Sequence, residues 1–403
     1  MPAKPHPLIA SRPPPPDNRR TAYIWRNRAL QLVVLAIIGL LVWYLIGNTL
    51  ANMRARGAHA GFDFLLDPAG FEISEGLFGY ESGQPFWRAF LVGLGNTVRV
   101  ALSSIVVCTV LGTLLGIGRL SRNFLLRSLC TAYVELVRNV PILLQLLMWY
   151  FVLSDMLPTS DEALSPLPGL FLSKSGLVFP VPASPLSWIY AGAGLLLGVT
   201  ASFLHLRRAS RVLSDSGRQL PRVWPVVLMV CGGIALGYAL GGLIGDTGWA
   251  FDLPEKSEIN ISGGAAVTPE FLAVFLGLST YTAAFVAEVV RAGVQSVQHG
   301  QLEAARALGL GRVQQLRLVI LPQAMRVILP SLTNQYLNLT KNSSLAVAVG
   351  YPDLVSIANT SLNQTGRAFE CVAIIMAVYV SLSILTALFM HRFNRRADLK
   401  GLA

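Results

Sequence analysis

The stretch Leu30–Leu50, LQLVVLAIIGLLVWYLIGNTL, contains no charged side chain. About 20 apolar residues are enough for a helix to cross a bilayer core of roughly 30 Å. The rest of the 403-residue chain resembles this stretch, because only 13% of its residues are charged, against about 25% in soluble domains. The sequence therefore predicts an all-α protein that crosses a membrane several times.

Working outward from this first stretch, we expect a polytopic helical bundle of about eight spans. They lie near residues 30–50, 88–118, 132–156, 188–206, 224–246, 270–296, 330–350 and 371–391. Five of them carry polar residues, glycines and motifs, and form the predicted core. The remaining three spans lack such motifs. They are the first span and the two spans of an inserted hairpin, at 188–206 and 224–246.

The distribution of basic residues predicts the orientation of the chain. With the N-terminus in the cytoplasm, 24 of the 32 Lys and Arg residues fall in cytoplasmic segments and six in outer segments. This bias follows the positive-inside rule and places both termini in the cytoplasm. The net charge of +11 is then a consequence of topology, and no nucleic-acid partner is expected.

The chain divides into six predicted segments. They are a disordered cytoplasmic tail (1–29), the first span with an outer acidic segment (30–87), the first part of the core (88–156), an outer loop with the inserted hairpin (157–269), the second part of the core (270–395) and a short cytoplasmic tail (396–403). The tail contains Arg12-Pro13-Pro14-Pro15-Pro16, which favours an extended conformation.

Catalytic and metal chemistry have little support in the sequence. The four cysteines lie in or beside apolar spans without close pairing, and the five histidines are scattered, so we expect no metal, cofactor or disulfide framework. No lysine follows a glycine, so the chain has no P-loop of its own. If ATP drives this protein, another chain supplies the ATPase.

The most informative motif lies between the sixth and seventh spans. It reads Gln301-Leu302-Glu303-Ala304-Ala305-Arg306-Ala307-Leu308-Gly309 and continues to Val319-Ile320-Leu321-Pro322. Glu303 to Leu308 are strong helix formers, and Gly309 suits the left-handed position that ends a helix. A second short helix is expected to about Leu318, after which Pro322 and Pro330 break the chain.

This order of residues resembles the EAA loop of ATP-binding-cassette (ABC) importer permeases. The matching positions are Glu303, Ala304, Ala305, Gly309, Val319, Leu321 and Pro322, and the only departure is Val319, where isoleucine is usual. The resemblance implies that segment 297–329 docks into a groove on an ATPase subunit. The alternative is an amphipathic cytoplasmic loop without a partner.

The segments that flank this loop narrow the resemblance to one branch of the importer permeases. Residues 133–145, 281–293 and 334–345 are similar to the histidine/glutamine/arginine branch of polar amino-acid permeases. The long N-terminal part and the hairpin are similar to the Q-type subunit of general L-amino-acid importers of the Aap and Bzt type.

The resemblance implies import of polar L-amino acids through a bacterial inner membrane by alternating access. Its partners would be a second permease subunit, two ATPase subunits that bind ATP and Mg²⁺, and a periplasmic amino-acid-binding protein. Whether the pore is a homodimer or pairs this chain with a related one stays open, and the extra spans favour the related chain. A secondary transporter or channel is the alternative, but it leaves the Glu303–Pro322 pattern unexplained. Which amino acids are carried stays open.

A polar stripe in the seventh span is a candidate substrate pathway. Asn334, Asn338 and Lys341 follow helical spacing, and Asn342 and Ser344 flank the same side. A lysine within a span costs at least about 2.5–3.5 kcal/mol, so we expect a partner or an aqueous cavity. The partner is either a substrate carboxylate or Glu288, the latter in a structural ion pair. Alternatively, Lys341 lies at the membrane interface and needs no partner.

Other polar residues in the spans have structural as well as functional interpretations. Glu288 and Arg291 are three residues apart and suit an intrahelical pair, as do Glu135 and Arg138. Gln145 is either polar glue between helices or a substrate contact. Asn139-Val140-Pro141 predicts a helix kink or the start of a helix, and the spacing of Gly112 and Gly116 predicts close helix packing.

Overall fold

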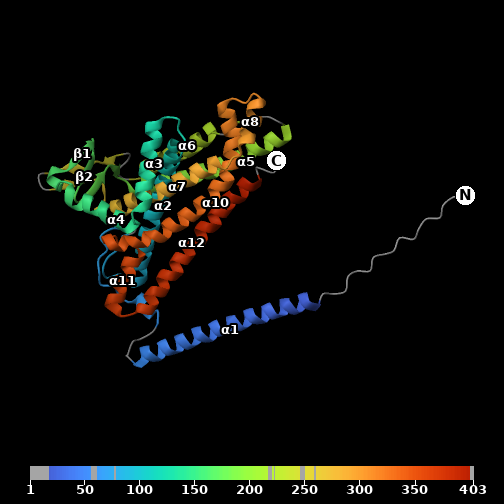
Figure 1. The fold of residues 1–403 in the computed structure, drawn as a ribbon. Helices are drawn as coiled ribbons and strands as arrows, with labels where there is room; N and C mark the ends of the chain where they lie inside the picture. The colour runs from blue at the N-terminus through green and yellow to red at the C-terminus, as the bar shows by residue number, and fades with distance from the viewer. Residues whose placement is uncertain are drawn as a thin grey trace.

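The computed structural model of the chain describes residues 18–55, 61–76, 79–216, 220–221, 223–245, 250–257 and 260–399. Over these ranges, seven helices are long and apolar enough to cross a membrane, or eight if one bent pair counts as a single span. The prediction of an all-α polytopic bundle is confirmed. Figure 1 shows α2, α7, α10 and α12 gathered in a bundle with α8 at one end and α11 at the other, and α1 lying apart from it.

The α-helices have the following bounds. They are α1 Asn18–Ala55, α2 Phe86–Arg119, α3 Phe124–Asn139, α4 Ile142–Phe151, α5 Pro185–Ser216, α6 Val223–Ile244, α7 Pro269–Gln295, α8 His299–Ala307, α9 Arg312–Gln314, α10 Leu321–Asn342, α11 Leu354–Thr365 and α12 Ala368–Leu399. Shorter helical turns are η1 Asp63–Leu66, η2 Val152–Met156, η3 Ser160–Glu162, η4 Gln315–Ile320 and η5 Ser343–Val349.

The two predicted tails are partly helical. Helix α1 begins at Asn18, inside the predicted disordered tail, because no proline lies between Asn18 and Ala55 to interrupt the helix. The polyproline run itself lies outside the described residues. Helix α12 likewise extends to Leu399, into the predicted C-terminal tail.

Helix α7 is the centre of the bundle and packs against α2, α3, α4 and α10. Glycines allow its neighbours to come close. A Cβ atom added at Gly112 of α2 would lie 2.5 Å from Cβ of Val286, and one at Gly116 would lie 2.8 Å from the carbonyl oxygen of Ala287. The predicted role of this glycine pair in helix packing is confirmed.

The third predicted span, 132–156, is not straight. Helices α3 and α4 meet at an angle of 103°. Val140 has an extended backbone, and Pro141 precedes the first residue of α4. The kink or helix start predicted at Asn139-Val140-Pro141 is confirmed, because α4 begins as a new helix directly after Pro141.

The proline breaks predicted after the coupling loop are also wrong. From Arg312 to Val349 the chain is helical throughout, through α9, the π-turn η4, α10 and η5. Pro322 stands in the first turn of α10, where its missing N–H costs little, and the π-turn before it changes the hydrogen-bond register. Pro330 lies inside the helix.

Short strands join the two loops predicted to lie outside the membrane. Strands β1 Leu164–Leu167, β2 Leu170–Ser173, β3 Gly176–Phe179 and β8 Ala265–Val267 form an antiparallel sheet in that order. Two small ladders pair β4 Val181–Pro182 with β5 Phe251–Asp252, and β6 Glu255–Lys256 with β7 Ile261–Ser262. The β3–β8 pairing places Val178 opposite Ala266, so the segment between them is an insertion closed at its base. No sequence pattern predicted these strands.

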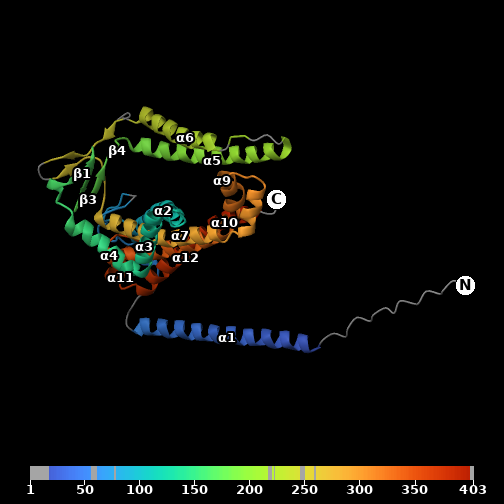
Figure 2. The ribbon, with the colours of Figure 1, turned by 45° about the horizontal axis from the view of Figure 1, so that its top comes forward.

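Helices α5 and α6 of this insertion lie side by side (Figure 2). Their contact is made by glycines. A Cβ atom at Gly194 would lie 2.0 Å from the carbonyl oxygen of Gly233, and one at Gly237 would lie 2.1 Å from that of Tyr190. The two backbones therefore touch, and the larger apolar side chains such as Leu196 and Leu228 are exposed.

Candidate functional site

The segment predicted to couple to an ATPase is a helix with a sharply defined end. The N–H of Gly309 donates to the carbonyl of Arg306, and the N–H of Leu310 donates to that of Ala305. This pair of bonds is a Schellman motif, which requires a left-handed residue after the helix. Gly309 has a φ of 73°, so the predicted left-handed position is confirmed.

Only one side of α8 is covered by the rest of the chain. Ala305 is buried against the bundle, whereas Glu303 and Ala304 are exposed. The turn after the helix presents two apolar side chains, with Leu308 79% exposed and Val313 76% exposed. The segment therefore has an uncovered surface at its tip that combines apolar and charged side chains.

Beyond the turn, the segment is held by α9 and η4, which lead into α10. The side chain of Gln315 donates to the carbonyl of Leu310 over 2.7 Å, and that of Gln314 accepts from the N–H of Gly311 over 2.9 Å. Leu321 is exposed and Pro322 is half-buried. The residues that match the EAA pattern thus form one continuous unit with the base of α10.

Glu288 has a partner other than Lys341. Its carboxylate forms ion pairs with Arg119 of α2 and Arg291 of α7. The predicted intrahelical pair with Arg291 is confirmed. The predicted alternative pairing with Lys341 is wrong.

The reason is the axial register of α7 and α10. Gly293 packs against Ile328, so those two residues lie at the same level. Counting 1.5 Å per residue from this level places Lys341 about 12 Å farther along the bundle than Glu288. Sequence alone could not supply that register.

The pair predicted between Glu135 and Arg138 is not formed either. Among the described residues, the guanidinium of Arg138 lies 5.1 Å from the ring centre of Phe285 instead.

Gln145 secures the bend between α3 and α4. Its side-chain amide donates to the carbonyls of Val137 (2.8 Å) and Val140 (3.0 Å), which the break in the helix leaves without intrahelical partners. Because Gln145 is buried and uses both amide protons in this way, the structure favours the glue interpretation over substrate contact.

The polar stripe of α10 lies on the surface of the single chain. Asn334, Asn338 and Lys341 are all exposed, and the side chain of Lys341 makes no hydrogen bond or ion pair to the part of the chain that the structure describes. Asn342 is half-buried, and the hydroxyl of Ser344 donates to the carbonyl of Lys341.

A pocket of about 260 Å³ adjoins the stripe. Helix α7 contributes Tyr281, Thr282 and Phe285, and α10 contributes Gln335, Asn338, Leu339 and Asn342. Two of the predicted pathway residues therefore line a cavity, and the aromatic residues of α7 complete it.

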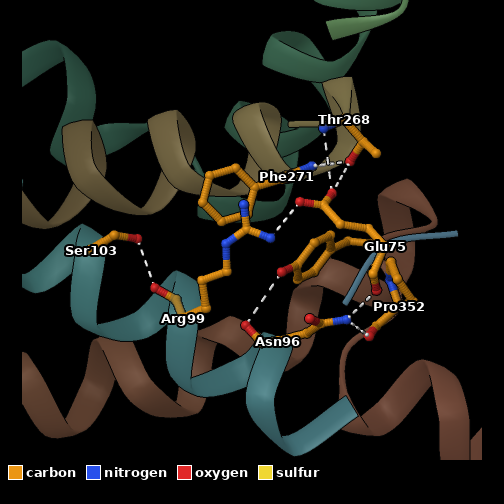
Figure 3. A network of polar contacts seen from close by, with 8 residues as sticks. Glu75, Asn96, Arg99, Ser103, Thr268, Phe271 and Pro352 are labelled. Atoms are coloured by element: carbon orange, nitrogen blue, oxygen red, sulfur yellow. Dashed lines mark hydrogen bonds and ion pairs between the residues drawn. The ribbon is translucent and has the colours of Figure 1, made fainter. Parts of the chain in front are cut away.

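A second polar cluster, at the α11 end, was missed by the sequence argument. Figure 3 shows Glu75 of the outer acidic segment facing Arg99 of α2, with an ion pair of 2.5 Å. The other oxygen of Glu75 accepts from the hydroxyl of Thr268, which caps α7, over 2.5 Å. Arg99 also lies over the ring of Phe271, 4.3 Å from its centre.

Asn96 extends this cluster to the loop after α10. Its amide donates to the backbone carbonyls of Glu75 (2.8 Å) and Pro352 (2.9 Å) (Figure 3). The acidic segment is thereby fastened to α2, α7 and the α10–α11 connection at one point. The lone Arg99 within an apolar span was the available sequence signal, but Glu75 lies 24 residues away with no fixed spacing.

Comparisons with known proteins match the chain over most of its length. A family model described as "Binding-protein-dependent transport system inner membrane component" matches residues 109–399. The chain is 43% identical over 375 residues to the general L-amino acid transport system permease protein AapQ of Rhizobium johnstonii, covering 93% of each chain.

Two further relatives are similar over comparable lengths. The putative amino-acid ABC transporter permease protein YhdX of Escherichia coli is 43% identical over 366 residues, with coverage of 91% of this chain and 92% of the relative. The glutamate/glutamine/aspartate/asparagine transport system permease protein BztB of Rhodobacter capsulatus is 36% identical over 430 residues, with coverage of 97% and 99%. The resemblance predicted from the motifs is confirmed.

Proposed function

The chain belongs to the family of binding-protein-dependent transport system inner membrane components, and on this premise we propose how it carries its substrate. It is a multi-pass permease subunit of an amino-acid ABC importer. The observation that bears most directly on its mechanism is the α8 segment, a short helix that packs against η4 and is uncovered at its tip.

In our proposal, α8 and the turn to α9 dock into a groove of an ATPase subunit. Leu308 and Val313 provide the apolar contact, and Glu303 lies on the exposed side of the helix. Because the segment continues through the π-turn into α10, a displacement of α8 is passed to the membrane-spanning helices. ATP and Mg²⁺ bind to that partner chain, and hydrolysis takes place there.

The orientation we propose places the α8 end in the cytoplasm. It is supported by the 24-to-6 distribution of basic residues. In a Cys231→Ser background, which removes the one exposed cysteine among the described residues, Glu72→Cys should react with an impermeant maleimide added to intact cells. Ser216→Cys should react only after permeabilisation. The reverse pattern would invert the chain and remove the docking proposal.

The assembly we propose contains two membrane subunits, two ATPase subunits and a periplasmic binding protein. The family description names binding-protein dependence, and the relatives are named as permease proteins of larger transport systems. The added helices α1, α5 and α6 favour a second permease subunit of different sequence. Co-purification from the native membrane, followed by mass measurement of the intact complex, would distinguish it from a homodimer.

For the substrate path we propose the α10 stripe and the adjoining pocket between α7 and α10. Lys341 supplies positive charge for the carboxylate that every amino acid carries, and Asn338 and Asn342 offer hydrogen bonds at the pocket wall. The names of the relatives support polar L-amino acids as cargo, since BztB is named for glutamate, glutamine, aspartate and asparagine.

The central test is uptake by reconstituted liposomes. The complex should import a labelled polar amino acid only with ATP and loaded binding protein, and vanadate should stop it. Uptake that is insensitive to vanadate would favour a secondary transporter instead.

The pathway has its own test in the same assay. Lys341→Met should retain its ATPase partner and lose uptake, whereas Lys174→Met, an exposed lysine of the outer sheet, should behave as wild type. Normal uptake by Lys341→Met would leave that lysine without a role in transport.

A further inference from the structure

A second polar pocket, of about 530 Å³, lies where α2, α3 and α7 meet near the α8 end. This volume is in the range of small-molecule sites. Its lining is Arg119, Arg127, Ser128, Thr131, Ala132, Glu135, Arg291 and Gln295, and we call it the Arg127 pocket. It shares no residue with the pocket between α7 and α10.

The guanidinium groups on one wall carry uncompensated positive charge. Arg119 and Arg291 share a single carboxylate, that of Glu288, so these three residues have a net charge of +1. Arg119 is only 11% exposed, and its Nε atom is buried with no hydrogen-bond partner among the described residues. The wall therefore carries one positive charge that the described residues do not neutralise, which favours an anionic ligand.

The opposite wall, on α3, offers one free charge of each sign. Arg127, Thr131 and Glu135 are spaced by four residues and share one face of the helix. The side chains of Arg127 and Glu135 make no hydrogen bond or ion pair to the part of the chain that the structure describes. Two turns, or about 12 Å of helix, separate them.

The sum of these charges selects a class of ligand. The three arginines, together with Glu135 and Glu288, give the pocket a net charge of +1, with Glu135 as its free carboxylate. A phosphate or a simple dicarboxylate would leave Glu135 facing negative charge. A dicarboxylic α-amino acid has two carboxylates and one ammonium group, and so matches the pocket group by group.

We propose that the Arg127 pocket binds a dicarboxylic α-amino acid such as L-glutamate. One carboxylate binds Arg127, the other binds the Arg119–Arg291 pair, and the ammonium group binds Glu135. Charge-assisted hydrogen bonds of this kind are the stronger ones in proteins.

The position of the pocket gives this binding a consequence, which rests on the orientation proposed above. Arg291 and Gln295 lie ten residues beyond Tyr281 and Phe285 on α7, about 15 Å closer to the α8 end. A ligand there reaches the pocket from the cytoplasm. Gln295 is four residues before α8, so an occupied pocket braces the junction through which the ATPase acts and slows import as the product accumulates.

Equilibrium binding tests the site directly. The full complex, in nanodiscs of zwitterionic lipid and without binding protein, is titrated with labelled L-glutamate, and glutarate and L-lysine compete. L-Glutamate should bind more tightly than either competitor, because glutarate has no ammonium group and L-lysine has only one carboxylate.

Two variants separate the roles of the free charges. Glu135→Gln should weaken L-glutamate binding about tenfold and leave glutarate no weaker, whereas Arg127→Gln should weaken both about tenfold, as expected for loss of a hydrogen bond to a charged group. Arg122→Gln, an exposed arginine before α3 that does not line the pocket, is the matched control and should bind as wild type.

Three outcomes would overturn the proposal. They are the absence of saturable L-glutamate binding, unchanged binding by Glu135→Gln, and preferential retention of anionic lipid by the wild type in place of L-glutamate. Vanadate-sensitive uptake measured on the same preparations separates the importer function from the proposed cytoplasmic binding site. If uptake persists in any of these cases, the importer function stands and the cytoplasmic site alone is rejected.

Discussion

Replacing Gly309 should uncouple transport without disturbing the membrane bundle. Its φ of 73° is left-handed, and a residue with a Cβ atom pays about 1–2 kcal/mol to adopt that conformation. A Cβ atom at this position would meet nothing within 4 Å, so the whole cost lies in the backbone and none in collision. For Gly309→Ala, this cost lowers the ratio of the capped to the uncapped conformation of the α8 end by roughly five- to thirtyfold.

Such a shift matters because α8 has only nine residues. Isolated helices of this length are marginal in water, so α8 depends on its cap and on its contact with η4. Gly309→Val should be more severe than Gly309→Ala, and Gly309→Asn milder, since asparagine tolerates the left-handed region.

The matched control is Gly300, in the same helix and also with open space around its Cβ position. Its φ is not left-handed, so Gly300→Ala should stabilise α8 by up to about 1 kcal/mol. In the liposome assay, Gly309→Ala should lower ATP-driven uptake and retention of the ATPase, while Gly300→Ala preserves both. Equal uptake by the two variants would refute the argument that the left-handed cap positions the coupling helix.

Three more changes test the bundle and its outer end. Gly112→Val should collide with Val286 and lower the melting temperature and yield of the purified chain, whereas Gly192→Ala, which has open space, should not. Gln145→Leu should lower the free energy of unfolding by about 1–3 kcal/mol, because two carbonyls at the α3–α4 bend lose their donor. The loss should appear as a lower midpoint of thermal unfolding, and an unchanged midpoint would mean that water replaces the amide. Burial raises the pKa of Asp353 from 3.8 to about 7, so the folded chain holds a proton that the unfolded chain has released. The Asp353 contribution to stability therefore falls as the pH rises from about 4 to about 7. In Asp353→Asn, the melting temperature should depend less on pH over that interval. An equally steep profile in the variant would assign the pH dependence to other groups.

Features that depend on local composition could be predicted from the sequence. A charge-free run of sufficient length crosses a membrane wherever it lies, so the spans followed from counting. The left-handed Gly309 followed from a run of helix formers that stops at a glycine. The Gly112 and Gly116 contact followed from spacing, because small residues four apart let backbones approach.

Features that depend on what lies opposite a residue could not be predicted. Pro322 and Pro330 were expected to break the chain, but a π-turn and neighbouring helices support them. For the same reason, sequence analysis suggested Glu288 as a partner of Lys341, whereas the structure pairs the Glu288 carboxylate with Arg119 of another helix. The contact between Glu75 and Arg99 joins a loop to a span, and no periodicity marks such a pair.

The exposure of the α10 stripe is an argument about assembly as well as substrate. A lysine facing lipid costs at least about 2.5–3.5 kcal/mol, and each amide without a hydrogen-bond partner adds several more. Asn334, Asn338 and Lys341 together would thus make a lipid-facing position of α10 unfavourable compared with one that faces water or protein. On our proposal, a second membrane subunit covers this face and encloses a wet cavity between two such stripes. If that subunit differs in sequence, Lys341 can serve the carboxylate common to all amino acids, while the opposite stripe distinguishes their side chains.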